Sequence, residues 1–174
     1  MHKDFYHLNK IWCSYRAKEN IFCFDDTKEY IGLTNTTVIF DTNEDLDLKY
    51  LLALLNSRTL NFRYKSIGKQ TGSGVYEYFE NGVGKLPIPK IDKESQKPFI
   101  KLVDEILEAK QKIKDYKPLL DEAIKNNNFD REIALKKELE NLENICSTNE
   151  KTIDQMVYKL YDLTPDEIKI VEGL

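Results

Sequence analysis

The sequence has little histidine and cysteine, and this shortage argues against several kinds of catalytic and metal site. The two histidines are His2 and His7, so a serine or cysteine nucleophile elsewhere has no obvious histidine base. The three cysteines, Cys13, Cys23 and Cys146, form no CxxC pair, whereas a structural zinc site takes four ligands in close pairs. We therefore expect reduced structural thiols and no metal site.

Long apolar runs are also missing. No stretch approaches the roughly 18 to 20 apolar residues that span a bilayer, and the N-terminal MHKDFYHLNK lacks the apolar core of a signal peptide. We expect a cytoplasmic protein with no membrane partner. With 174 residues, 41% of them apolar, the chain is long enough for one domain with a helical appendage and apolar enough to fold.

Apparent catalytic motifs fail on spacing. The segment Pro165–Lys169 superficially matches the PD…ExK pattern of nucleases, but its two acids are adjacent in the first turn of an expected helix, where they cap the helix. The glycines of segment 68–74 lack the spacing of both glycine-rich nucleotide-binding motifs. We therefore expect no catalytic residue and no cofactor or metal bound by this chain.

Charge is unevenly distributed along the chain. Residues 1–92 carry 12 basic and 12 acidic side chains, whereas residues 93–174 carry 14 and 18, which accounts for the whole net charge of −4. Segment 56–76 contains four cations and no acid. Because phosphate contacts depend on the charges that touch the DNA backbone, such a local basic segment is enough for nucleic-acid binding.

The first part of the chain has the period of strands, interrupted by short helices. The β-branched and aromatic runs Ile11–Tyr15, Ile21–Phe24, Val38–Phe40 and Val75–Phe79 predict strands of a small mixed sheet. A helix is expected over Leu48–Leu55, with Asn43 or Asp45 as its N-cap, acids in its first turn and Asn56 at its end. A second short helix is expected over Thr59–Lys65. Gly68, Gly72 and Gly74 then allow unusual backbone angles, and Pro87 and Pro89 force an extended exit.

From Ser95 onward the apolar period becomes helical. We therefore expect an α+β fold, with a small mixed-sheet α/β domain over 1–92 and a helical, coiled-coil-like region over 93–174. Pro118 and Asn126–Asn128 are the expected breaks in a hairpin of antiparallel arms. Thr164–Glu167 forms a capping box that starts a final short helix. Three helices are predicted from three apolar stripes: Phe99, Leu102, Val103, Ile106, Leu107 and Ile113; Leu135, Leu139, Leu142 and Cys146; Ile153, Met156, Val157, Leu160 and Tyr161.

Three segments carry a resemblance to a known family: Leu51–Ser57 (LLALLNS), Leu86–Pro89 (LPIP) and Ile153–Glu172. Over residues 10–173 their order resembles the TaqI-like C-terminal specificity domain. This domain is the target-recognition module of type IIG restriction-modification enzymes and is related to the specificity subunits of type I systems. The resemblance implies a C-terminal piece of such an enzyme, or of an adenine-specific DNA methyltransferase, so that Met1 is not the original start.

The resemblance also implies partners. They are double-stranded DNA and a methyltransferase domain or subunit. A homodimer formed through the helices is a further option. S-adenosylmethionine and Mg²⁺ are expected only in the parent enzyme, because this chain has no Pro-Pro pair and therefore lacks the methyltransferase signature.

Long donors, amides and hydroxyls beside glycines suit the reading of base edges and phosphates. An alternative interpretation is that these cations are only solvated and that the glycines serve the turn. The predicted DNA contacts are Arg16, Arg58, Arg63, Lys65, Lys69, Gln70, Thr71 and Ser73.

Two other functions remain open from the sequence. A type I specificity subunit or half-subunit would share the mechanism, and half-subunits should dimerise through the helices. A protein-interaction scaffold would bind a partner through its coiled arms, with the α/β part as a cap, and would not bind DNA at low salt.

Overall fold

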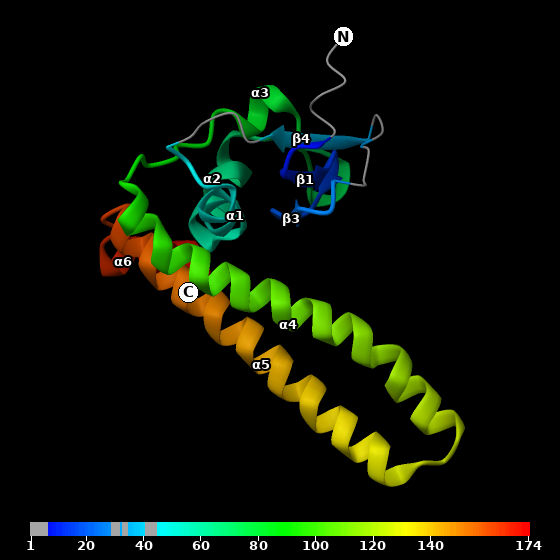
Figure 1. Cartoon of the computed structure of the whole chain (residues 1–174). Helices are drawn as coiled ribbons and strands as arrows, with labels where there is room; N and C mark the ends of the chain where they lie inside the picture. Colours follow the sequence, from blue (N-terminus) through cyan, green and yellow to red (C-terminus); the bar gives the residue numbers. More distant parts are fainter. Residues whose placement is uncertain (1–6, 29–31, 33–34, 41–44) are drawn as a thin grey trace. The chain divides into compact units, whose positions relative to one another are not determined.

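The computed structural model describes residues 7–28, 32, 35–40 and 45–174. The chain divides into two compact units (Figure 1). The first unit consists of residues 1–100 and 153–174, and the second unit consists of residues 101–152. The predicted boundary at residue 92, between an α/β target-recognition domain and a helical spacer and docking region, stays a prediction.

The first sheet is built around β1. Strand β1 (Lys10–Ser14) pairs antiparallel with β3 (Phe22–Asp25) and with β4 (Thr36–Phe40), in the order β3-β1-β4. Ile11 and Cys13 alternate into the core, as expected for a half-buried strand. The three strands predicted from β-branched and aromatic runs are therefore confirmed, with ends shifted by one or two residues.

A buried ion pair lies across this sheet. Lys10 and Asp25 face each other in register, and Nζ of Lys10 is 3.3 Å from a carboxylate oxygen of Asp25. Burial alone would raise the pKa of Asp25, but hydrogen bonds from Thr27 and Trp12 and the nearby Lys10 outweigh it, so the pKa lies below its usual value. Because each buried charge has its partner, the fold alone accounts for this ion pair.

The second sheet is smaller and also antiparallel. Its strands are β2 (Arg16–Ala17), β6 (Val75–Glu77) and β5 (Lys69–Thr71), in the order β2-β6-β5. The α+β class is confirmed, but all the described strand pairs are antiparallel rather than mixed. Strand β5 was expected as part of a turn, because its polar side chains carry no strand pattern and its pairing partner comes later in the chain.

Two short helices follow each other closely in the first unit. Helix α1 (Leu48–Asn56) buries nearly all of its residues, and α2 (Arg58–Ile67) follows after Ser57. The N-cap of α1 is Asp47, whose side chain accepts from the Lys49 amide, and the first turn holds no acid. The prediction of Asp45 as the N-cap was therefore wrong, and its carbonyl accepts a hydrogen bond from the Gln96 side chain. Asn43, the other predicted N-cap, lies outside the described residues.

The end of the segment Leu51–Ser57 joins these helices to the first sheet. The Asn56 side chain accepts from the amide of Phe22 and donates to its carbonyl, both at 2.9 Å, which imitates a strand pairing. Ser57 caps α2 by accepting from the Leu60 amide and donates its own hydroxyl to Leu54. Polar residues inside an apolar run are thus the groups that fix α1 against β3.

The LPIP segment is held by two tyrosines that are far away in the sequence. It follows a 3₁₀ turn at Gly72–Gly74 and helix α3 (Glu80–Val83). The hydroxyl of Tyr50 donates to the Pro89 carbonyl at 2.9 Å, and that of Tyr161 donates to the Pro87 carbonyl. All three segments that carry the family resemblance therefore lie within the first unit.

The C-terminal region has two long helices and one short one. They are α4 (Lys93–Lys125), α5 (Phe129–Leu160) and α6 (Pro165–Glu172), and α4 and α5 run antiparallel in Figure 1. The break at Asn126–Asn128 is confirmed, but α4 continues through Pro118. Packing on both sides, partial at Ile113 and complete at Ala123, outweighs the one backbone donor that proline lacks.

The second and third predicted stripes lie on one helix, α5, rather than on two, except for Tyr161, which follows its last residue. Within the second unit the arms meet through buried Leu139, Leu142 and Cys146, and an ion pair joins Lys110 to Glu150 at 3.2 Å. No helix among the described residues is long and apolar enough to cross a membrane.

Candidate nucleic-acid interface

The acid-free segment 56–76 folds as α2, β5 and the turn into β6, and Tyr64 anchors it. The Tyr64 hydroxyl donates to the Glu77 carbonyl at 2.6 Å, and its ring stacks on Tyr78 with centroids 4.3 Å apart. Burial raises the pKa of Tyr64 to about 12, so its phenol stays protonated and donates. A Cβ at Gly82 would lie 2.6 Å from the Tyr64 oxygen, so glycine leaves room for this contact.

Two predicted contact residues converge on one acid. Arg16 of β2 and Lys69 of β5 both stand opposite Glu77 of the central strand β6, so the three side chains share one face of the sheet. Arg16 Nη2 lies 3.0 Å from Glu77 Oε1, and Lys69 Nζ lies 2.8 Å from Glu77 Oε2. The cations are 61% and 66% exposed, whereas the Glu77 side chain is 4% exposed.

The contact with the two cations keeps the Glu77 side chain ionised. Hydrogen bonds from Lys69 and then Arg16 hold the pKa of Glu77 below its usual range, and the same contact with Glu77 raises the pKa of Lys69. The carboxylate is therefore charged at neutral pH. Glu77 is a candidate residue of this surface that the sequence reasoning missed, and its signal was its place as the first acid after segment 56–76.

The turn residues do not all lie on that face. Gln70 stands opposite Tyr76, so its side chain is on the other face of the sheet from Lys69. The Thr71 hydroxyl donates to the Val75 carbonyl at 3.1 Å, which closes the turn. Ser73 is exposed at the tip of the turn with a left-handed φ of 68°.

The prediction that three glycines supply unusual backbone angles is wrong for two of them. Gly74 has a positive φ of 72°, but Gly72 does not, and Gly68 has a φ of −70°. Gly68 is instead required by a close approach, since a Cβ there would lie 2.7 Å from the Tyr64 ring.

Helix α2 carries the other three predicted cations. The backbone amide and Nε of Arg58 both bind the Asp154 carboxylate, at 2.9 and 3.3 Å, so this guanidinium is partly neutralised. Arg63 is exposed and donates to the Ser66 hydroxyl at 3.4 Å, and Lys65 is exposed. In the part of the chain that the structure describes, Lys65 has no ion-pair partner.

The acids of the nuclease-like PDEIK segment cap α6. The Glu167 carboxylate accepts from the Thr164 amide at 2.8 Å, the Thr164 hydroxyl accepts from the Glu167 amide, and Asp166 pairs with Lys169. The predicted capping box is confirmed. Among the residues described, no three His, Cys, Asp or Glu side chains gather so that they could hold a metal ion.

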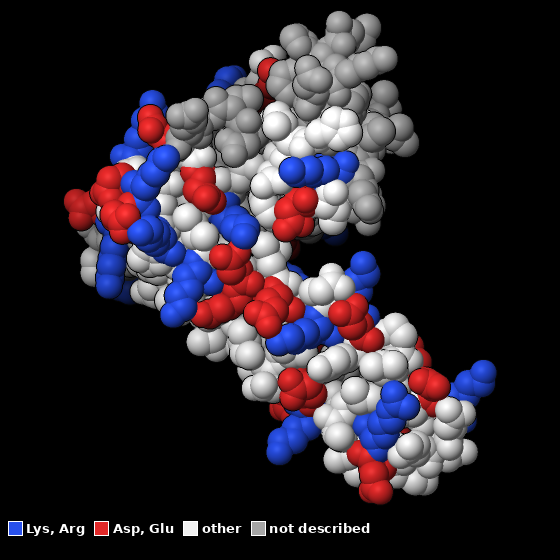
Figure 2. Space-filling view, in the orientation of Figure 1, with Lys and Arg blue, Asp and Glu red and all other residues white. Residues whose placement is uncertain are grey.

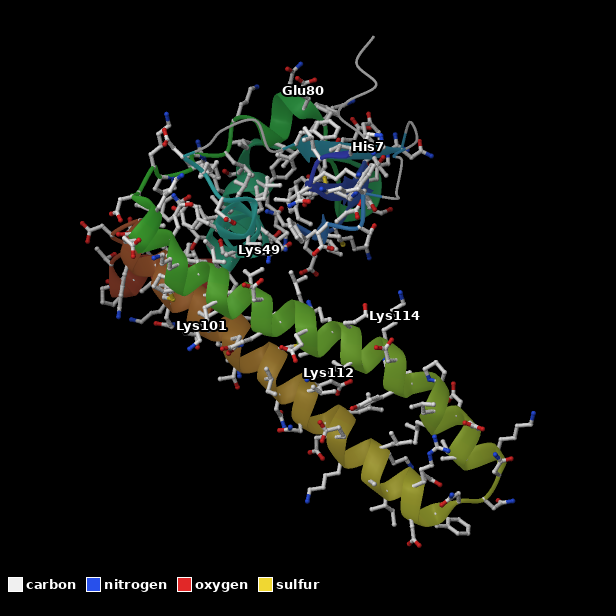
Figure 3. The ribbon with its side chains drawn as sticks, in the orientation of Figure 1. His7, Lys49, Glu80, Lys101, Lys112 and Lys114 are labelled. Carbon is white, nitrogen blue, oxygen red and sulfur yellow. The ribbon has the colours of Figure 1, made fainter. Side chains whose placement is uncertain are left out.

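Charges on the second unit are mixed in sign. Figure 2 shows basic and acidic side chains interspersed over the arms of α4 and α5. Neighbouring pairs along the helices neutralise each other, such as Glu108 with Lys112 at 2.7 Å, the latter labelled in Figure 3. The segment with an excess of cations therefore belongs to the first unit.

The family model of the TaqI-like C-terminal specificity domain matches residues 1–88. No curated protein matches the chain. The match includes all eight predicted contact residues, from Arg16 to Ser73, while the resemblance beyond residue 88 stays a prediction. Specificity domains of this kind recognise DNA targets in restriction-modification systems. Because the matched region is half of the sequence, the chain belongs to the family of TaqI-like C-terminal specificity domains.

Proposed function

We propose that this chain recognises a double-stranded DNA target as the C-terminal specificity region of a type IIG restriction-modification enzyme or of an adenine-specific DNA methyltransferase. The observation that carries the proposal is the folded acid-free segment 56–76 inside the family-matched region. Its helix and strand are fixed together through Tyr64, and it presents exposed Arg63, Lys65 and Lys69. A rigid surface of this charge suits phosphate contacts.

The exposed cations divide into two roles. Lys65 and Lys69 are point charges that suit phosphates, whereas Arg63 and Arg16 carry the planar fork that pairs with guanine O6 and N7. Arg58 is 53% exposed and pairs with Asp154 through Nε, so part of its charge is already neutralised. Thr71 and Ser73, together with Gln70 on the other face of the sheet, place further polar groups at the turn.

Catalysis belongs to the rest of the parent enzyme in this proposal. A methyltransferase domain or subunit flips the target adenine and uses S-adenosylmethionine, and any nuclease domain uses Mg²⁺. This chain holds the duplex in register for that chemistry. It contributes no catalytic group, since the acids of its nuclease-like segment serve the helix cap.

The type I alternative uses the same surface and differs in its partner. A half-subunit should dimerise through α4 and α5, whereas the specificity region of a single-chain enzyme should be a monomer. Analytical ultracentrifugation of the full chain separates these two outcomes. A dimer that dissociates when Ile133, an exposed apolar residue of α5, is changed to Asp would favour the half-subunit.

The salt dependence of binding tests the proposed surface. Changing both Lys65 and Lys69 to Ala should flatten the slope of log K against log salt by up to about 2 for a duplex of random sequence, since each phosphate contact contributes about 0.9. Lys114→Ala with Lys137→Ala is the matched control, because both lysines are exposed on the second unit; Figure 3 labels Lys114.

A wild-type slope in the Lys65 and Lys69 variant would contradict phosphate contacts by these two lysines. Absence of any binding at low salt would instead favour the protein-interaction scaffold.

A further inference from the structure

Glu77 is an unexpected residue in a surface that binds phosphates. A carboxylate between two cations repels DNA and lowers the affinity for any sequence. It is nevertheless buried, ionised and in contact with both Arg16 and Lys69. Desolvation of the buried carboxylate costs free energy, and water screens its pairs with two exposed cations, so folding alone gives a weak reason for this arrangement.

Each group around Glu77 has a fixed position. Its carbonyl accepts from Tyr64, and its strand β6 is the centre of the second sheet, so the backbone cannot shift freely. The two cations come from the flanking strands at the same register. Arg16 has a second support, since its guanidinium carbon lies 5.6 Å from the centre of the Tyr15 ring.

We propose that Glu77 is a positioning residue that holds Arg16 and Lys69 in one arrangement before DNA binds, and that it thereby favours the preferred sequence over others. This inference rests on the proposed recognition of DNA. Long cationic side chains lose conformational entropy when a duplex orders them, and a buried carboxylate at their centre imposes that order beforehand. The specificity gained comes at the expense of affinity for random sequences.

Glu77→Gln tests the inference because it removes the charge and keeps the shape. The probes are the preferred duplex, selected from a randomised pool by the wild-type full chain, and the unselected pool itself. Affinity for the preferred duplex should fall while affinity for the pool holds or rises, so that the preference drops by roughly tenfold. A merely structural role would lower both affinities together, and simple electrostatics would raise both.

Glu80→Gln is the matched control, since it makes the same charge change at an exposed acid of α3, labelled in Figure 3. Its preference should equal that of the wild type. In the double variant Arg16→Ala with Glu77→Gln, the losses of preference should not add, because Glu77 acts through Arg16.

An unchanged preference in Glu77→Gln, or equal changes on both probes, overturns the inference. If the wild-type chain selects no sequence from the pool, the proposed function itself fails and the inference with it. Should Glu77→Gln not fold, the exposed variants Arg16→Ala and Lys69→Ala decide. Unchanged preference in both would refute the positioning role.

Discussion

At the scale of the residue, Tyr64 links the helix that carries the predicted cations to the sheet that carries Glu77. Its ring fills the space that Gly68 and Gly82 leave, and its hydroxyl donates to the Glu77 carbonyl at 2.6 Å. Because the hydroxyl is buried, water cannot replace the bond when it is lost. Tyr64 therefore both stabilises the fold and holds α2 against the sheet that contains Glu77.

Tyr64→Phe should lower the free energy of unfolding by about 1 to 3 kcal/mol, because a buried carbonyl loses its donor. Urea denaturation followed by circular dichroism measures this change. Tyr76→Phe is the control, since Tyr76 is half-buried and its hydroxyl makes no hydrogen bond with the residues described. Equal stability of the two variants would mean that the Tyr64 bond contributes nothing.

At the scale of the element, α6 depends on its first turn. Helix α6 is short, buries none of its residues fully and lies against α2. Its capping box satisfies the amides of Thr164 and Glu167, and hydrogen bonds from Thr164 hold the pKa of Glu167 below its usual value. Local hydrogen bonds rather than packing therefore set where α6 begins.

Thr164→Ala should make α6 easier to open by about 1 kcal/mol, which corresponds to roughly fivefold faster amide hydrogen exchange at Glu167 and Ile168. Thr152→Ala is the matched control in the middle of α5, where the hydroxyl only bonds back to the Thr148 carbonyl. Exchange rates in α6 that do not change in Thr164→Ala would contradict the role of the cap.

At the scale of the whole molecule, the chain leaves the first unit after residue 100 and returns to it at residue 153. The second unit between these points holds none of the eight predicted DNA contacts. Its two arms are matched in register, since Lys110 pairs with Glu150 and Glu122 pairs with Arg131. The hairpin can therefore be shortened evenly without touching the candidate interface.

Removing residues 113–119 together with 134–140 takes about two helical turns from each arm. The shortened chain should fold and keep the wild-type salt slope for DNA. Removing 113–119 alone should fail, because the arms no longer match. The readouts are circular dichroism and binding to a random duplex over a salt series. A lower salt slope in the evenly shortened chain would place DNA contacts on the hairpin.

Sequence periodicity anticipated most of the elements and few of their contacts. The strands around Ile11, Phe22 and Val38, the helices on both sides of Ser57 and the capping box at Thr164 follow from neighbouring residues, and they were confirmed. The continuation of α4 through Pro118 was missed, because a proline by itself predicts a helix break, whereas the burial of Ala123 beyond it appears only in the folded chain. Which of the predicted contacts touch DNA stays a prediction.

By itself, the sequence determined the α+β class, the strands of the first sheet, the helices on both sides of Ser57 and the acid-free segment 56–76, since each depends on residues that are close in the chain. Only the tertiary structure decided that Glu77 binds Arg16, which is 61 positions away, and that Gln70 and Lys69 lie on opposite faces of one sheet. The physical reason is strand register: pairing across β2, β6 and β5 brings together side chains that no local pattern connects.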